Sequence, residues 1–187
     1  MIKLAILASG SGTNAENIVK HFANSDKISI EIIISNKSDA FVHQRAKNLG
    51  ISSETLPISD LRDGKKMVEY MRSMNIDYII LAGYLLMIPK ELVENYPNKI
   101  INIHPALLPK HGGKGMYGDN VHKAVVEAKD AESGITIHYV NENYDEGQTI
   151  FQAKCKVEEN DTAESLAKKI HALEQEYFPT VLERICL

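Results

Sequence analysis

The sequence contains only two cysteines, Cys155 and Cys186, which lie far apart and form no C-x-x-C motif. Such isolated cysteines suggest neither a disulfide scaffold nor a zinc site. Long hydrophobic runs are also missing, because the apolar run in "MIKLAILASG" ends at glycine after a few residues. That run is too short for the core of a signal peptide or for a membrane span. We therefore expect a cytoplasmic protein with reduced thiols.

The chain also lacks excess positive charge and the common catalytic motifs. A net charge of −4 gives no general attraction to nucleic acid or to an anionic membrane, so we expect small-molecule partners. There is no G-x-S-x-G elbow around a nucleophilic serine. There is also no H-E-x-x-H motif or other close cluster of metal ligands, so no metal is expected. Direct transfer of a group between two bound substrates is the simplest chemistry that remains.

The order of predicted elements indicates an α/β fold. Short apolar runs predict strands, and they alternate with helical periodicity over the first 130 residues, which is typical of a parallel, doubly wound sheet. The predicted strands are 3–8, 28–35, 52–57, 77–82 and 99–104, and the predicted helices are 14–25, 39–50, 63–75 and 120–129. Segments 133–140 and 148–157 are expected to pair as an antiparallel hairpin. A long amphipathic C-terminal helix should begin at an Asp161 or Thr162 cap. We expect a single domain over residues 1–187, with a mostly parallel Rossmann-like sheet.

The first strand leads into a glycine turn that could hold a phosphate. Gly10–Ala15 fits G-x-G-x-x-A between a strand and a helix, which is the form of the dinucleotide fingerprint. However, the second strand ends in Ser35-Asn36, not in the acidic residue that would bind a ribose. Backbone N–H groups at a helix N-terminus attract phosphate, and Ser11, Thr13 and Asn14 add side-chain donors. We favour a phosphomonoester over NAD. The alternative is a plain tight turn with Thr13 or Asn14 as N-cap.

A second candidate site lies in "INIHPALLPK", residues 101–110. Residues two apart on a strand share a face, so Asn102 and His104 should point the same way. An amide N–H beside an imidazole suits an oxyanion and a proton transfer. Asp145, in the predicted hairpin loop, should approach His104 and raise the pKa of its imidazole. The alternative is an ordinary strand-end histidine and an Asp-Gly-type turn.

Taken together, these segments resemble the phosphoribosylglycinamide formyltransferases, the folate-dependent enzymes of de novo purine (IMP) synthesis. The resemblance covers nearly the whole chain and follows "GSGTN", "SNKSDA", "LAGYLLMIP", "INIHPALLPK", "SGITIHYVNENYDEGQTIFQAK" and "HALEQEYFP". It implies the formyltransferase fold, with a phosphate-binding half (1–100) and a folate-binding, catalytic half (101–187). It also implies transfer of a formyl group from 10-formyltetrahydrofolate to the amine of glycinamide ribonucleotide, through a tetrahedral intermediate.

The resemblance assigns roles residue by residue. It implies the catalytic residues Asn102, His104 and Asp145. It implies a substrate site of Ser11, Gly12, Thr13, Asn14 and Glu174. It implies folate contacts from Leu85, Leu86, Met87, Ile88, Asn102, Asn141, Glu142 and Asp145. Leu108-Pro109 resembles a bond that is cis in the family. Leu86 stands where the family often has arginine, so the outward contact of that arginine is absent here. Arg62 and Lys65 are candidates for the basic residue that meets the folate tail.

The sequence leaves three other classes of function open. A tRNA formyltransferase or a formyltetrahydrofolate hydrolase of this fold normally carries a further region, for which we find no signal. An amino-sugar formyltransferase is harder to exclude, although the phosphate-type turn argues against it. A non-catalytic folate- or nucleotide-binding module would not need the Asn-His-Asp set. The chain is expected to be a monomer or a homodimer, and the glycine-rich loop 111–122 is a candidate lid.

Overall fold

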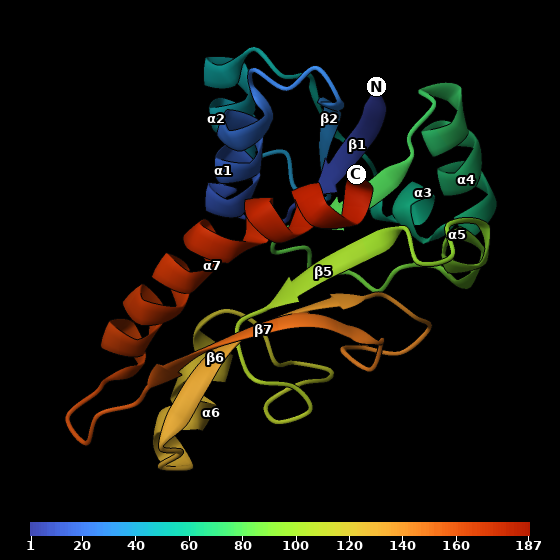
Figure 1. The fold of residues 1–187 in the computed structure, drawn as a ribbon. Coiled ribbons are helices and arrows are strands. Elements are labelled where there is room, and N and C mark those ends of the chain that lie inside the picture. Colours follow the sequence, from blue (N-terminus) through green and yellow to red (C-terminus); the bar gives the residue numbers. More distant parts are fainter.

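The computed structural model describes all of residues 1–187, arranged around one seven-stranded sheet (Figure 1). The strands lie in the order β3-β2-β1-β4-β5-β6-β7. Their bounds are β1 Ile2–Leu7, β2 Ile28–Ser35, β3 Ser53–Thr55, β4 Tyr78–Leu81, β5 Ile100–His104, β6 Glu132–Tyr139 and β7 Thr149–Lys156. The helices are α1 Thr13–Phe22, α2 Val42–Leu49, α3 Ile58–Arg62, α4 Gly64–Ser73, α5 Lys90–Asn95, α6 Asp119–Glu127 and α7 Ala163–Cys186.

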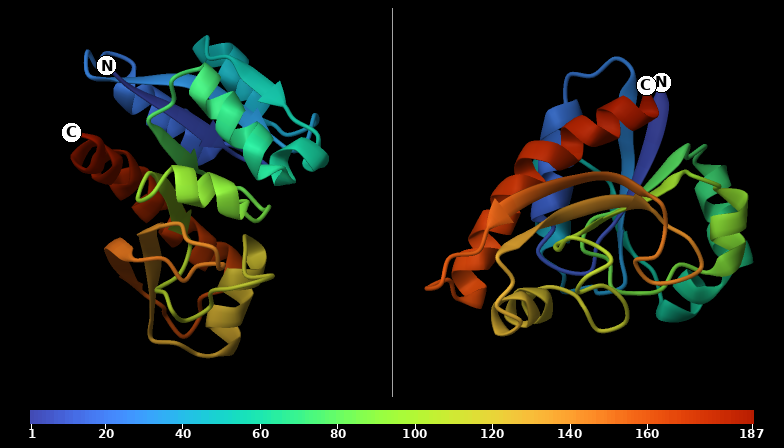
Figure 2. Two further views of the ribbon diagram at one scale, coloured as in Figure 1. Left: turned by 90° about the vertical axis from the view of Figure 1, so that its right-hand side faces the viewer. Right: turned by 60° about the horizontal axis from the view of Figure 1, so that its bottom comes forward.

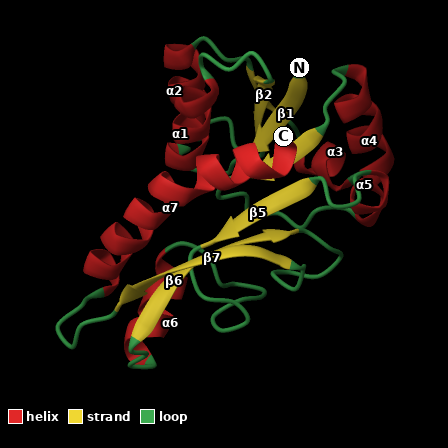
Figure 3. Cartoon of the chain, in the orientation of Figure 1, coloured by secondary structure: helices red, strands yellow, loops and turns green.

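Six strands run in one direction, and only β6 runs against them. β1 to β5 pair in parallel, whereas β6 pairs antiparallel with both β5 and β7. The predicted mostly parallel sheet, the antiparallel hairpin and the long final helix are therefore confirmed (Figure 3).

Helices cover both faces of the sheet, because alternate residues of the central strands point to opposite sides. Leu4 and Ile6 of β1 belong to a large apolar cluster with residues of α1, α2 and α7. Ala5 and Leu7 belong to a second cluster with residues of α3, α4 and α5. Figure 2 shows α1 and α7 on one side of the sheet and α3 to α5 on the other. Both faces of β1 are buried over residues 4–7, which explains why this part of the strand is continuously apolar.

The sequence-based elements agree with the structure except for two short helices. α3 and α5 follow Pro57 and Pro89 and were not predicted. They contain 5 and 6 residues, which is less than two turns, so the apolar periodicity that reveals longer helices is absent. The other boundaries were nearly correct: α7 begins after Thr162, whose side chain accepts from the Ser165 N–H in a capping box.

The order of the strands indicates which edge of the sheet binds ligands. From β1 the chain adds β2 and β3 on one side and then returns to add β4 and β5 on the other. The direction in which strands are added to the sheet therefore reverses at β1. The loops that follow β1 and β4 lead away to opposite faces of the sheet, which leaves a crevice between them. In open parallel sheets, ligands bind at this reversal, beyond the carboxyl ends of the strands.

Candidate active site

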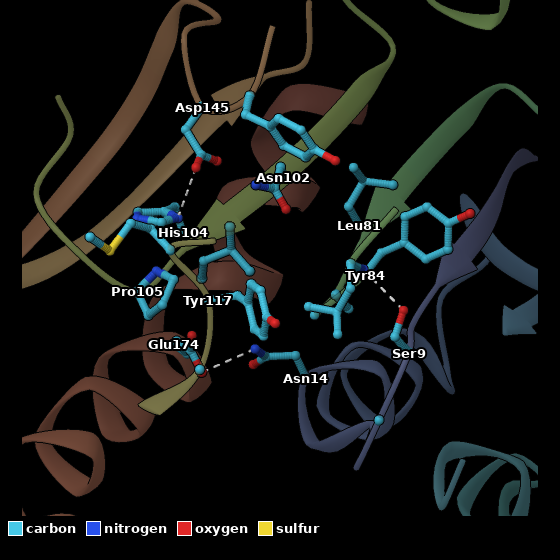
Figure 4. A pocket seen from close by; sticks show the side chains of 18 of the residues that line it. Ser9, Asn14, Leu81, Tyr84, Asn102, His104, Pro105, Tyr117, Asp145 and Glu174 are labelled. Atoms are coloured by element: carbon cyan, nitrogen blue, oxygen red, sulfur yellow. Dashed lines mark hydrogen bonds and ion pairs between the residues drawn. The ribbon is translucent and has the colours of Figure 1, made fainter. Parts of the chain in front are cut away.

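A cavity of about 1000 Å³ lies at this edge of the sheet. Its walls come from the turn after β1, the segment after β4, the end of β5, the loop before α6, the loop between β6 and β7, and one face of α7 (Figure 4). This volume is at the upper end of the ~300–1,000 Å³ that small-molecule sites usually have, so the cavity has room for a large ligand or for two ligands together.

The glycine turn forms one end of the cavity and exposes backbone donors. Ser11, Gly12, Thr13 and Asn14 all line it. Gly12 occupies the N-cap position of α1 with a left-handed φ of 75°, and no side chain caps the helix. The alternative of a Thr13 or Asn14 cap is therefore wrong. None of the backbone N–H groups of residues 10–14 donates to a protein acceptor, which leaves them free for an anion.

Asn14 is instead tied to α7. Its Nδ2 donates to Glu174 Oε2 at 3.1 Å, and Gln175 Nε2 donates to Asn14 Oδ1 at 3.3 Å. Glu174 is buried, and it also accepts from His171 Nδ1 at 3.0 Å, which raises the pKa of the His171 imidazole. The sequence placed Asn14 and Glu174 in one site, and the structure brings them into contact across 160 residues of chain.

The side chains of Asn102, His104 and Asp145 meet at the other end of the cavity (Figure 4). Asn102 and His104 lie at the end of β5, as predicted from strand parity. His104 is 3% exposed, and its Nδ1 lies 3.5 Å from Asp145 Oδ2. The predicted approach of Asp145 to His104 is confirmed. The Gly113 N–H also donates to Asp145 Oδ2, at 2.9 Å.

The expected rise in the pKa of His104 is wrong. Burial lowers the pKa of its imidazole, and the Asp145 charge and the His111 carbonyl only partly oppose this effect. For Asp145, burial raises the pKa, but the neighbouring His138 and His104 rings and the Gly113 N–H outweigh it and leave the pKa below its ordinary value. The free site therefore favours a neutral imidazole beside a carboxylate.

His138 is a site residue that the sequence analysis missed. It lies opposite Asn102 in the β5–β6 pair, so the two side chains share a face. The ring Nδ1 donates to Tyr139 O at 2.9 Å, so in the neutral ring Nε2 accepts, and Asn102 Nδ2 then donates to it at 3.1 Å. His138 Nε2 also lies 3.6 Å from Asp145 Oδ1. The alternation of residues in β6 predicts which residues share a face with His138. It does not show that His138 faces Asn102, because that depends on the register between β6 and β5.

The segment after β4 forms an apolar wall of the cavity. Leu85, Leu86, Met87 and Ile88 line it, together with Tyr84 and Val140. Ser9 Oγ accepts from the Leu85 N–H at 3.0 Å, which ties this wall to the end of β1. Leu85 and Met87 are 37% and 46% exposed, which is apolar surface that a flat aromatic ligand could cover.

Three of the predicted contacts lie outside the lining. Asn141 and Asp145 line the cavity, but the exposed Glu142 does not, and its carboxylate lies 3.5 Å from Lys90 Nζ. Arg62 and Lys65 are exposed and also lie outside the lining. Burial raises the pKa of the Tyr84 phenol, and the charge of nearby Arg62 opposes that rise. The Arg62 charge is thus near enough to this lining residue to act on its pKa.

The loop behind His104 is held by β6. The Leu108–Pro109 bond is cis, as expected. Thr136 Oγ1 donates to Ala106 O at 2.7 Å and accepts from the Leu108 N–H at 3.0 Å. Further along, residues 113–119 line the cavity, with left-handed glycines at 113, 115 and 118.

No group of three or more His, Cys, Asp or Glu side chains is placed to hold a metal ion. None of the helices has the length and apolar composition needed to cross a membrane.

Comparison with known proteins agrees with this geometry. Residues 2–182 match the formyl transferase family. Curated relatives include a chloroplastic phosphoribosylglycinamide formyltransferase of Arabidopsis thaliana, 41% identical over 98% of this chain and 65% of the relative. A phosphoribosylglycinamide formyltransferase of Bacillus subtilis (strain 168) is 34% identical over 99% of this chain and 95% of the relative. The chain spans less than two thirds of the two plant relatives, 65% and 61% of their lengths.

Solved structures show the same likeness. A phosphoribosylglycinamide formyltransferase from Anaplasma phagocytophilum superposes with a TM-score of 0.89 at 33% identity, covering 99% of this chain and 86% of that one. Glycinamide ribonucleotide transformylase 1 from Geobacillus kaustophilus gives a TM-score of 0.89 at 31% identity, covering all of both chains. The chain therefore belongs to the formyl transferase family. Within that family it resembles the phosphoribosylglycinamide formyltransferases, which confirms the resemblance found in the sequence.

Proposed function

We propose that this protein transfers a formyl group from 10-formyltetrahydrofolate to the amine of glycinamide ribonucleotide, a step of purine synthesis. The main support is that a single cavity joins a turn with free N–H groups at one end to the Asn102, His104 and Asp145 side chains at the other. A substrate with a terminal phosphate and a distant amine fits this arrangement. The names of the relatives described above agree with this proposal.

In this proposal the two substrates meet from opposite walls. The 1–100 half holds the phosphate at Ser11 to Asn14, with Glu174 of α7 on the ribose. The apolar wall of residues 85–88 and the backbone near Asn141 and Asp145 hold the pterin. Arg62, which lies near Tyr84, meets the acidic folate tail. Residues 1–187 act as one domain, and the loop 111–122 acts as a lid. No metal takes part in this proposal.

The protein's contribution to the chemistry is oriented groups and proton transfer. Asn102 has two amide N–H bonds, and only one is used by His138, so the other is free to stabilise the oxyanion that forms as the amine adds to the formyl carbon. His104, neutral in the free site, takes the proton that the amine loses and returns it to the departing folate nitrogen. Asp145 stabilises the protonated ring during this exchange. The proton is conserved over the cycle.

The cellular setting follows from the same proposal. A metabolic enzyme of this kind is expected in the cytoplasm as a monomer or a homodimer. Two plant relatives carry the word chloroplastic in their names, so a plastid is the alternative compartment.

The decisive experiment is a turnover assay with glycinamide ribonucleotide and 10-formyltetrahydrofolate, following the appearance of deformylated folate. Native protein should show turnover, and Asn102→Ala should lose roughly a hundredfold in kcat with little change in KM, because one oxyanion donor contributes ~3 kcal/mol. An amino sugar tested as a competing acceptor should be inert. Turnover with the amino sugar and none with the ribonucleotide would overturn the proposal.

A further inference from the structure

One side chain outside the cavity is connected to His104 through the backbone. His104 Nε2 donates to the carbonyl oxygen of His111 at 2.8 Å. The ring of His111 does not line the large cavity, but a separate one of about 370 Å³ shared with Lys110 and Asp130. There, His111 Nε2 donates to Asp130 Oδ2 at 2.7 Å. His111 therefore links His104 to Asp130, because its backbone carbonyl accepts from the first and its ring donates to the second.

The backbone of His111 needs support in this position. Its φ is 53°, in the left-handed region, where a residue with a Cβ atom is unfavourable. Asp130, which supplies the support, is itself fixed at the end of α6, where its N–H donates to Val125 O at 3.3 Å. The Asp130–His111 bond thus connects a helix end to the residue whose carbonyl faces His104. Loss of that bond frees the residue to turn its carbonyl away.

The His111 carbonyl determines which nitrogen of His104 carries the proton. A carbonyl oxygen only accepts, so Nε2 must be protonated. In the neutral ring Nδ1 is then the basic nitrogen, and it is the one 3.5 Å from Asp145. With the opposite tautomer, Nδ1 would already hold a proton and could not take one from the amine. Which nitrogen of His104 can take the proton from the amine thus depends on the position of the His111 carbonyl, and His111 does not line the substrate cavity.

We propose that the His111–Asp130 pair is a positioning device that holds His104 in its Nε2–H tautomer, with Nδ1 free to exchange the catalytic proton. The pair touches no substrate and acts only through the His111 carbonyl. Its catalytic consequence depends on the function proposed above, whereas its effect on the tautomer does not.

The direct test is the nitrogen NMR spectrum of the His104 imidazole in the full-length protein, recorded without substrate at a pH where the ring is neutral. Native protein should show a protonated-type Nε2 and an unprotonated-type Nδ1. His111→Phe keeps an aromatic ring but removes the bond to Asp130, and it should shift both nitrogens toward averaged values. Asp130→Ala should do the same, and it serves as the test if His111→Phe does not fold. Asp130→Asn keeps an acceptor and should restore the native pattern.

Lys110→Ala is the matched control. Lys110 Nζ lies 3.2 Å from the other oxygen of Asp130, and its side chain is 70% exposed, so its loss should leave the tautomer and turnover unchanged. In the formyl transfer assay, His111→Phe should lower kcat by roughly tenfold, part of the ~10²–10⁴ that acid–base catalysis contributes, with KM nearly unchanged.

The outcomes separate the two proposals. If His111→Phe and Asp130→Ala leave the His104 nitrogen signals native, the positioning role is wrong, even if kcat falls. If the signals change but native protein shows no formyl transfer, the positioning role stands and the proposed function fails. A native signal pattern that lacks a protonated Nε2 would also overturn the inference.

Discussion

The phosphate turn depends on the absence of a side chain at Gly12, which makes Gly12→Ala an informative substitution. A Cβ atom there would lie 2.4 Å from Val42 Cγ2 and 2.9 Å from Val42 Cα, distances that real Cβ atoms do not show. The Val42 N–H donates to Gly10 O at 3.2 Å, so α2 is bound to the turn that it crowds. The alanine therefore displaces the turn, α2 or both.

The expected magnitude has two parts. The left-handed φ of 75° makes any L-residue cost ~1–2 kcal/mol at this position. Overpacking against Val42 adds ~1–3 kcal/mol, and the stiffer unfolded chain returns ~0.4–1 kcal/mol. Gly12→Ala should therefore lower the free energy of unfolding by ~1–5 kcal/mol. Displacement of the turn should also raise KM for the ribonucleotide, by about tenfold for each ~1.4 kcal/mol of phosphate binding that is lost.

Gly50→Ala is the matched control. Gly50 has a φ of 70° at the end of α2, but a Cβ atom there would meet nothing within 4 Å. Gly50→Ala therefore measures the cost of the left-handed conformation without the clash, which should be ~0–1.6 kcal/mol, and KM should stay unchanged. Urea unfolding of the native protein and both variants measures the difference. Equal losses of stability in the two variants would refute the close approach of α2, and an unchanged KM for Gly12→Ala would refute the role of the turn in binding.

Three further predictions follow from the site and the core. His138→Phe removes the acceptor that orients the Asn102 amide, and should lower kcat several-fold while KM changes little; an unchanged kcat in steady-state assays would contradict this role. The Glu174 carboxylate raises the pKa of His171, so its contribution to stability is fully present below the unfolded value near 6.5 and is lost as pH rises through the higher folded value. Urea unfolding against pH should therefore show a stability difference between native protein and Glu174→Gln that shrinks above pH ~6.5, and a constant difference would oppose it. Phe178→Ala in the fully buried part of α7 should cost ~3–5 kcal/mol in urea unfolding, and a loss below 1 kcal/mol would mean that α7 is poorly packed.

Much of the fold could be predicted because local and global signals agree. The strand predicted at 28–35 matches β2 at both ends, since its β-branched run 32–34 is buried in the sheet. Gly50 ends α2 with a φ of 70°, as its position after the last apolar residue indicated. The two helices that were missed are too short to show periodicity, and prolines preceding them gave only a boundary signal.

The sequence predicted the main residues of the site, but it did not predict the pKa of His104 or the part played by His138. The effect of Asp145 on the pKa of His104 has the expected sign, yet burial has the larger effect, and burial depends on how the rest of the fold covers the ring. Such cover is a tertiary property that no local pattern encodes. His138 was missed for a related reason: its partner Asn102 is set by strand register, which the alternation of one strand does not reveal.

The approach of Asp145 to His104 was predicted correctly, but from an incomplete argument. The hairpin was expected to bring its loop beside the end of β5. The register instead places Tyr139 opposite Ile101 and His104 opposite Thr136, so the loop leaves β6 at the start of β5, the wrong end. It must therefore fold back over the face that carries Asn102 and His104.

Local features of the loop make that return possible. Asp145 adopts a left-handed φ of 56°, and its carboxylate accepts from the Gly113 N–H at 2.9 Å. Gly147 passes so close to Tyr139 that a Cβ atom would overlap the Tyr139 carbonyl oxygen. In "YDEGQ" the glycine therefore does more than mark a turn, since it lets the loop lie flat against β6 and deliver the carboxylate to His104. A side chain at 147 should lift the loop and separate Asp145 from His104. Gly147→Ala is therefore expected to raise the activation free energy of turnover, seen as a lower kcat, by more than it lowers the free energy of unfolding.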